Sequence, residues 1–295
     1  MVRVSSALIL GLALLAGAPA AAQIAYSVRS DGSTSATDDF LYSINLGSGI
    51  ATPIGNTGFE DVESLAFAPG CATLYAVDDV TDRLLACNPV SGACTAVGPL
   101  GVNVTDTGLA FAANGFLYMS TDVPPNFYRV NHITGLATLI GDQGQEITGL
   151  AGDSEGTLFG LGGDGVDNLV RIDIVTGEAT EIGPLGSAVT LVDGGLDVGA
   201  SGTLYGIHDG SVGRATSSQI FTINPNTGAA TVVTGVRTAT GSSLDGFEGL
   251  AIASGVCAAV GGQSVVEIPT AGEWGLAALV LALGVSGIAV LRRWA

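Results

Sequence analysis

The sequence contains no lysine, and only 12% of its 295 residues are charged. Four of the charged residues lie in two terminal segments with the character of targeting signals: Arg3, Glu273, Arg292 and Arg293. The remainder holds 26 acidic residues against 6 arginines, a formal charge of −20. This balance argues against nucleic acid as a partner, because nucleic-acid binding needs clustered basic side chains that replace counterions. An acidic exported domain gains solubility from its charge and also attracts divalent or organic cations.

Signatures of enzymes are also scarce. The chain has two histidines and lacks a Gly-x-Ser-x-Gly elbow, an HExxH pair, a P-loop and a dinucleotide-binding glycine pattern. His132 falls in a repeated turn, where we expect an exposed loop residue, and His208 stands beside Asp209 in the longest repeat. We therefore predict a protein that is not an enzyme. The alternative is a secreted Ca²⁺-dependent hydrolase or lyase with His208 as the base, and a third reading is a structural matrix protein without a discrete ligand.

Glycine is abundant, at 45 residues, and it ends a turn motif that occurs five times. The motif is Asn or Asp, two variable residues, Ser or Thr, and Gly, and its copies begin at Asn45, Asn88, Asn131, Asp173 and Asn224. The starts are separated by 43, 43, 42 and 51 residues. Asn or Asp accepts a backbone hydrogen bond at the start of a tight turn, and Gly adopts positive φ at its end. The motif therefore predicts one β-hairpin in each repeat.

A strand-like segment with a Leu-Ala or Leu-Asp pair also recurs, at 64–67, 108–111, 149–151, 195–198 and 249–252. Together with the strand that follows it and the two strands of the hairpin, it makes four strands per repeat, which at this period predicts a propeller blade. The first repeat lacks the segment, and a copy follows the last hairpin. We therefore predict an all-β fold over residues 23–257, a five-bladed β-propeller of four-stranded blades. Segment 249–252 would complete the first blade beside the strand at 24–28, which leaves no long open edge.

The four cysteines are all in the exported part, and an even number there indicates two disulfides with three possible pairings. Cys87 and Cys94 occupy facing hairpin positions that are apolar in the other repeats. Cys71 and Cys257 each follow a Leu-Ala segment at a similar distance. We predict the pairs Cys87–Cys94 and Cys71–Cys257, the second of which would clasp the ring where the chain ends meet.

Acidic residues recur at two places in the repeats. One set precedes the Leu of the innermost strand, and a second follows the next strand: Glu63, Asp106, Glu146, Asp193 and Glu248, then Asp31, Asp78, Asp79, Asp122, Asp164 and Asp209. Both connections open on one face of a propeller, so these carboxylates should crowd at the channel mouth, where they repel one another unless a cation bridges them. Ca²⁺ takes six to eight oxygens and is the candidate cofactor, although Asp is also a common turn residue. The candidate ligand or metal residues are Glu63, Asp106, Glu146, Asp193, Glu248, Asp209 and His208.

Residues 1–22 read as a secretory signal peptide. Arg3 gives the positive start, an apolar run follows, and Ala20 to Ala22 offer small residues for cleavage. At the other end, an Ala- and Gly-rich linker over 258–267 leads to a tail over 268–295. Its uncharged run at 275–291 reaches the lower length limit of a transmembrane helix. The basic pair after this run would hold the C-terminus in the cytoplasm.

The tail resembles the IPTL-CTERM sorting signal of Gram-negative bacteria. The matching residues are Ile268, Pro269, Thr270, Trp274 and Gly275, with Ala271 in place of the usual Leu, followed by the span and by Arg292 and Arg293. The resemblance implies processing by an exosortase-type membrane peptidase, a transient anchor in the inner membrane, and delivery to the cell surface or its matrix.

The repeats resemble those of secreted bacterial propellers with the pattern LYxI(N/D)PxTGxxTxIG, most clearly at Asn88-Pro89 and at 224–228. This resemblance implies the fold alone, because propellers host many functions. We expect a surface-sorted binding or scaffold protein. Its expected partners are an extracellular polysaccharide, an envelope protein or a small cationic ligand.

Overall fold

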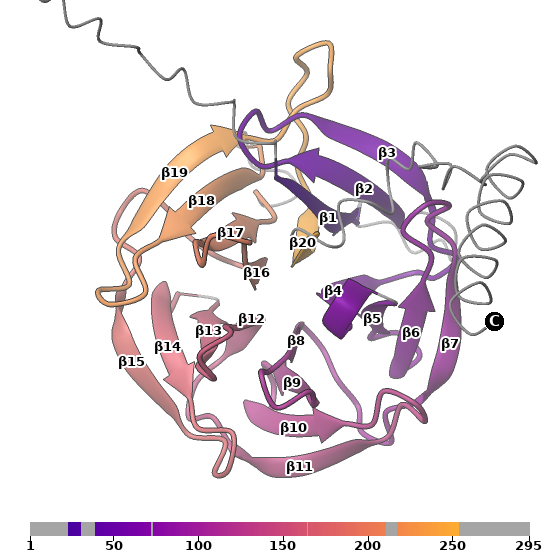
Figure 1. The fold of residues 1–295 in the computed structure, drawn as a ribbon, viewed down its shortest axis with the longest axis vertical. Helices are drawn as coiled ribbons and strands as arrows, with labels where there is room; N and C mark the ends of the chain where they lie inside the picture. Colours follow the sequence, from indigo (N-terminus) through magenta and orange to yellow (C-terminus); the bar gives the residue numbers. More distant parts are fainter. Residues whose placement is uncertain (1–22, 31–38, 72, 164, 211–216, 254–295) are drawn as a thin grey trace, which may run out of the picture. The chain divides into compact units, whose positions relative to one another are not determined.

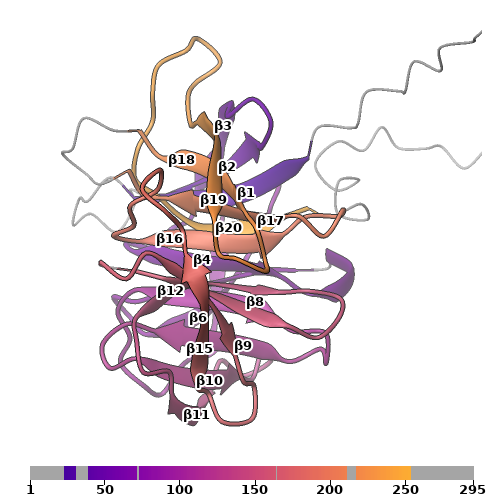
Figure 2. The same ribbon diagram turned by 90° about the vertical axis from the view of Figure 1, so that its left-hand side faces the viewer.

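The computed structural model describes residues 23–30, 39–71, 73–163, 165–210 and 217–253. In this part of the chain, twenty strands form five antiparallel four-stranded sheets, the blades of a β-propeller (Figure 1). The innermost strands contact one another in a closed ring, from β4 to β8, β12, β16 and β20 and back to β4 (Figure 1). Figure 2 shows the same blades from the side. The predicted all-β propeller of five four-stranded blades is confirmed.

Each blade runs from an innermost strand at the axis to an outermost strand. Blade 1 contains β20 (Phe247–Ile252), β1 (Ile24–Arg29), β2 (Phe40–Asn45) and β3 (Ala51–Asn56). Blade 2 contains β4 (Val62–Phe67), β5 (Leu74–Asp78), β6 (Arg83–Cys87) and β7 (Cys94–Pro99). Blade 3 contains β8 (Thr107–Phe111), β9 (Leu117–Thr121), β10 (Asn126–Val130) and β11 (Ala137–Asp142).

Blades 4 and 5 repeat this order. Blade 4 contains β12 (Ile147–Gly152), β13 (Leu158–Gly162), β14 (Asn168–Ile172) and β15 (Ala179–Pro184). Blade 5 contains β16 (Gly194–Val198), β17 (Leu204–His208), β18 (Gln219–Ile223) and β19 (Ala230–Gly235).

The ring closes as predicted, between the two ends of the described chain. Strand β20 pairs antiparallel with β1, with Tyr26 opposite Ala251 and Val28 opposite Glu248. The long fifth repeat adds a second connection through its extra segment 236–246, the orange loop above β3 and β19 in Figure 1. There the Arg237 N–H donates to the Gly49 carbonyl, and the Arg237 carbonyl accepts from Ala51 N–H. Part of the insertion that marks the fifth repeat therefore joins blade 5 to blade 1.

The core is divided among the five interfaces between blades. Each cluster of buried side chains contains one Leu from the repeated Leu-Ala or Leu-Asp pair, and each of these Leu side chains is 2% exposed: Leu65, Leu109, Leu150, Leu196 and Leu250. Burial of one Leu side chain stabilises the fold by about 1.5–3 kcal/mol. The repeated Leu is thus one contributor, common to all five interfaces, to the packing of each blade on its neighbour.

The turn motif also has a packing role at the outer rim. In the turn of blade 3, Asn131 Oδ1 accepts from the N–H groups of Ile133 and Thr134, as the sequence predicts. The closing Gly135 has φ +84°, and a Cβ there would lie 2.5 Å from the carbonyl oxygen of Gly98 in blade 2. The same approach of two glycines occurs at the other interfaces: Gly92 with Gly55, Gly177 with Gly141, Gly228 with Gly183, and Gly49 with Gly235. The motif is therefore a blade-stacking element.

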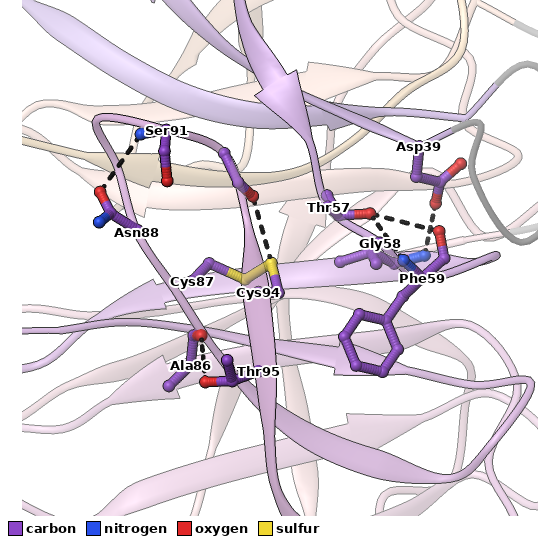
Figure 3. Close-up of a disulfide and its surroundings, with 12 residues drawn as sticks. Asp39, Thr57, Gly58, Phe59, Ala86, Cys87, Asn88, Ser91, Cys94 and Thr95 are labelled. Carbon is purple, nitrogen blue, oxygen red and sulfur yellow. Dashed lines mark hydrogen bonds between the residues drawn. A yellow bond between two sulfur atoms is a disulfide. The ribbon is translucent and has the colours of Figure 1, made fainter.

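The predicted Cys87–Cys94 disulfide is present and links facing residues of β6 and β7 (Figure 3). Cys71 ends the short 3-10 helix η1 (Pro69–Cys71) after β4. Its predicted partner Cys257 lies outside the described residues, so that pairing stays a prediction.

Several other expectations concern residues outside the described part of the chain. These are the signal peptide at 1–22, the linker at 258–267, the sorting motif, and the apolar span at 275–291. Among the described residues, none of the helices has the length and hydropathy to cross a membrane.

Candidate functional site at the acidic end of the ring axis

The five acids of the first predicted set all lie where the innermost strands begin. Glu63 and Glu248 are the second residues of β4 and β20, and the other three immediately precede β8, β12 and β16. Each blade thus brings one carboxylate to the same end of the axis. We call this the acidic end, defined by Glu63, Asp106, Glu146, Asp193 and Glu248.

Three of these carboxylates converge. One oxygen each from Glu63, Asp193 and Glu248 lies within 4.8 Å of the other two. They come from blades 2, 5 and 1, which are the three consecutive blades around the ring closure. Glu63 is 5% and Asp193 7% exposed, and Glu248 is half-buried.

Register shifts lie beside two of the three converging acids. The pairing of β4 with β5 shifts register between Val62 and Leu65, and the pairing of β1 with β20 shifts between Tyr26 and Val28, beside Glu248. Such bulges bend a strand and change where a side chain points.

Glu63 and Glu248 lie at these two shifts, whereas Asp193 joins them from just before β16, a strand whose pairing has no shift. Glu146 lies beside a shift at Ile147 and stays outside the group, so the shifts alone do not select the acids that meet.

A second group shares Glu63. Oxygens of Asp61, Glu63 and Asp79 also lie within 4.8 Å of one another, and the Asp79 N–H donates to the Asp61 carbonyl at 3.2 Å. The two groups together form what we call the Glu63 cluster: Asp61, Glu63, Asp79, Asp193 and Glu248. Sequence reasoning did not identify Asp61. The available signal was its position two residues before Glu63, because residues two apart on an extended chain share a side.

The buried carboxyls of the cluster resist ionisation. Burial raises the pKa of Glu63, Asp193 and Glu248 well above the usual values, and neighbouring carboxylates raise it further. In each case the neighbours that raise the pKa are Asp or Glu residues. The one ion pair between described residues, Arg29 with Asp245, lies outside the cluster.

Two half-buried carboxyls, those of Asp79 and Asp106, show the same effect. Burial, followed by the charge of Asp61, raises the pKa of Asp79 to about 7. Burial, followed by the charge of Asp122, raises the pKa of Asp106 to about 6. Near neutral pH these groups repel one another unless protons or a cation reduce their charge.

Four carboxylate oxygens here are buried without a hydrogen-bond partner among the described residues: Glu63 Oε2, Glu248 Oε2, Asp78 Oδ1 and Asp79 Oδ1. A buried polar atom in that state is costly, and such atoms are rare in folded proteins. They call for a proton, a water or a bound cation.

The other predicted site residues lie outside both groups. Asp106 and Glu146 are half-buried, and Asp31 and Asp164 lie outside the described residues. Asp209 is buried, and its carbonyl accepts from Ser218 Oγ at 2.7 Å. Its charge acts on the cluster from outside by raising the pKa of Asp193 and Glu248.

His208 ends β17 and is engaged in local hydrogen bonds. Its Nδ1 accepts from Gly210 N–H at 3.0 Å, so the proton of the neutral ring is on Nε2, 3.3 Å from Gln219 Oε1. Burial lowers the His208 pKa, which favours this neutral form. The structure therefore places His208 in a loop-holding role and does not bring it into either carboxylate group.

His132 differs from the sequence expectation. It is half-buried, and its ring centroid lies 5.9 Å from that of Tyr75 and 5.7 Å from that of Phe111. The turn that carries it folds onto the neighbouring blade, which covers a side chain we expected to be exposed.

The opposite end of the axis carries an acid that sequence reasoning missed. A cavity of about 260 Å³ there is lined by the ends of the innermost strands and by Asp197. Asp197 accepts from the N–H groups of Ile252 and Val198 at 2.6 and 2.7 Å, and burial raises its pKa to about 7. The available signal was its place in the Leu-Ala pair, where the other four copies have Ala.

Comparison with known proteins supports the fold and leaves the function open. No protein-family model matches the chain, and no curated protein matches it. Among solved structures, TolB from Acinetobacter baumannii has a TM-score of 0.50 and 12% identity, over 79% of this chain and 67% of that chain. A chain of a nidogen/laminin complex has a TM-score of 0.49 and 13% identity, over 74% of this chain and 79% of that one. At 12% identity the likeness to TolB shows the fold alone. The strand order makes the chain an acidic five-bladed β-propeller.

Proposed function

We propose that this protein is an exported, non-enzymatic β-propeller that binds a partner at the cell surface or in the extracellular matrix. The observation that carries the proposal is the acidic end, where each of the five blades contributes one carboxylate to the same end of the axis. Binding residues are commonly presented by loops on a rigid scaffold, and a closed ring provides such a scaffold.

The location follows from the sequence. The signal peptide at 1–22 and the IPTL-CTERM-like tail at 268–295 support export followed by processing by an exosortase-type peptidase. The tail span at 275–291 would hold the chain in the inner membrane until it is processed.

The partner must suit a surface that is strongly negative. An extracellular polysaccharide or an envelope protein would bind through cationic groups or through bridging cations, and a small cationic ligand would bind directly. Carboxylates at the rim of the acidic end, Asp106 and Glu146, are half-buried and remain accessible to such groups.

The full chain is purified in mild detergent and immobilised. The test measures how much of the producing cell's own surface material this chain retains. Two variants with equal loss of charge are compared. One carries Asp106→Asn and Glu146→Gln at the acidic end, and the other carries Glu178→Gln and Glu181→Gln, which are exposed residues at and after the blade 4 turn. We expect the first variant to retain less extracellular polysaccharide or envelope protein from this material than the wild type does. The second variant should retain as much as the wild type. Equal retention by both variants would overturn the proposal.

A further inference from the structure

We propose that the Glu63 cluster is a Ca²⁺ site that ties blades 5, 1 and 2 together at the closure of the ring. This inference deepens the proposed binding function and rests on it, because the ion would lie at the same acidic end.

The spacing of the carboxylates fits one ion of this size. Ca²⁺ binds oxygens at about 2.3–2.6 Å, so two oxygens on opposite sides of the ion lie about 4.6–5.2 Å apart. Within each of the two groups that share Glu63, all three oxygens lie within 4.8 Å of one another. Three oxygens of either group can therefore contact one ion without moving a strand, and bidentate binding or waters would supply the other ligands.

A separate observation also points to a ligand. Glu63, the residue that both groups share, is 5% exposed, and its Oε2 has no hydrogen-bond partner among the described residues. Glu248 Oε2 is in the same state. A shared proton satisfies one pair of oxygens, whereas a divalent cation satisfies several at once and also offsets their mutual repulsion.

The donor set selects the kind of metal. All five groups are carboxylates, and His208, the histidine nearest in sequence to a cluster residue, uses both ring nitrogens elsewhere. Hard oxygen donors suit Ca²⁺, Mg²⁺ or Mn²⁺ rather than Zn²⁺ or Cu²⁺. Mg²⁺ demands near-octahedral geometry and keeps several waters, whereas Ca²⁺ accepts bidentate carboxylates in irregular cages. Carboxylates fixed to three different blades in a buried position favour Ca²⁺.

The location indicates what the ion would do. Glu248 is on β20, the strand that closes blade 1, and its two partners belong to the blades on either side. Backbones are already close at these contacts, since a Cβ on Gly249 would lie 2.6 Å from the Glu63 carbonyl oxygen. An ion held by Glu63, Asp193 and Glu248 would therefore join the closing strand to both neighbours.

The experiment measures Ca²⁺ binding by the full chain, stripped of metal with EDTA and then dialysed. Equilibrium dialysis with radioactive Ca²⁺ gives affinity and stoichiometry, and thermal unfolding with Ca²⁺ or Mg²⁺ at equal ionic strength gives the shift in Tm. Glu63→Gln is compared with Glu181→Gln, which removes the same charge from an exposed position on β15.

For the wild type and Glu181→Gln we expect about one bound Ca²⁺ per chain and a Tm rise of several degrees, larger with Ca²⁺ than with Mg²⁺. Glu63→Gln should bind at least ~10-fold more weakly, as expected when one carboxylate ligand is lost. Near-UV circular dichroism checks the folding of each variant, and Asp193→Asn serves as a second ligand variant. The inference is overturned if the wild type binds no Ca²⁺ at about 1 mM, the weak limit of extracellular sites. It is also overturned if folded Glu63→Gln binds as tightly as Glu181→Gln.

Failure of this inference is distinguishable from failure of the proposed function. If Ca²⁺ binds at Glu63 but no surface material is retained, the ion site stands and the binding role is wrong. If surface material is retained but folded Glu63→Gln binds Ca²⁺ as tightly as Glu181→Gln, the binding role stands and the ion site is wrong.

Discussion

Carboxylate oxygens of Glu63 and Glu248 lie within 4.8 Å of each other, although Glu63 belongs to blade 2 and Glu248 to the last strand of the described chain. Like charges are brought together at the point where the ring closes. Without a cation this contact opposes closure, and with one it supports closure.

Glu63→Gln should therefore change stability in opposite directions with and without Ca²⁺. In EDTA the variant should be more stable than the wild type by about 1–3 kcal/mol, because the Glu63 carboxyl must take up a proton to be buried near neutral pH and glutamine need not. In saturating Ca²⁺ the wild type gains about 2.7 kcal/mol at a hundredfold excess over Kd, and the variant should become the less stable of the two. Thermal unfolding in both buffers checks this, and a variant that is less stable in EDTA would contradict it.

Asp197 should make stability fall as pH rises. Its folded pKa of about 7 lies above the usual value of 3.8, so the unfolded chain loses this proton first. The associated stability is fully present below about pH 4 and is lost progressively up to about pH 7. Asp197→Asn should reduce that fall by about 1–3 kcal/mol, with allowance for the partial exposure of the carboxyl. The measurement is the free energy of unfolding by denaturant, taken for wild type and variant at several pH values across this range. If the two free energies change with pH in the same way, the effect is excluded.

Gly98→Ala should destabilise the contact between blades 2 and 3. The new Cβ would lie 2.1 Å from the Thr134 carbonyl oxygen, so the neighbouring turn must move. Overpacking of this kind costs about 1–3 kcal/mol. The control is Gly47→Ala, where the nearest atom, Asn45 Oδ1, is 3.6 Å away and φ is not in the left-handed region. Chemical denaturation of both variants tests the blade-stacking role, which equal stability of the two would refute.

The Cys71–Cys257 pairing is checked by peptide mapping of the non-reduced protein. We expect a cross-linked peptide that joins these two cysteines, in addition to the observed Cys87–Cys94 bond. In the chain-entropy treatment, the long loop closed by the first pair contributes about 5 kcal/mol and the short one about 2.5 kcal/mol. Reduction should therefore lower the Tm by more than the replacement of Cys87 and Cys94 alone. A bond from Cys71 to Cys87 or Cys94 would exclude the predicted clasp.

The sequence alone predicted the number of blades, the strand that closes the ring and the hairpin disulfide. Each of these depends on local chemistry that is repeated along the chain. Asn131 and its equivalents specify a turn, Leu150 and its equivalents specify an inward face, and Cys87 faces Cys94 because the hairpin register is set by the turn between them. Repetition makes such weak local signals readable.

Only the tertiary structure decided which acids meet. Glu63, Asp193 and Glu248 converge whereas Asp106 and Glu146 lie outside that group, although all five acids lie two to four residues before the repeated Leu. The distances across the axis depend on bulges and on the packing of neighbouring inner strands, which a repeat pattern does not encode. For the same reason the sequence did not predict that Asp61 belongs to the cluster. Nor did it predict that His208 forms a hydrogen bond within its own loop, with the N–H of Gly210. The sequence determined the ring because its blades are built from local patterns, and the fold determined the candidate site because that site is made of contacts between blades.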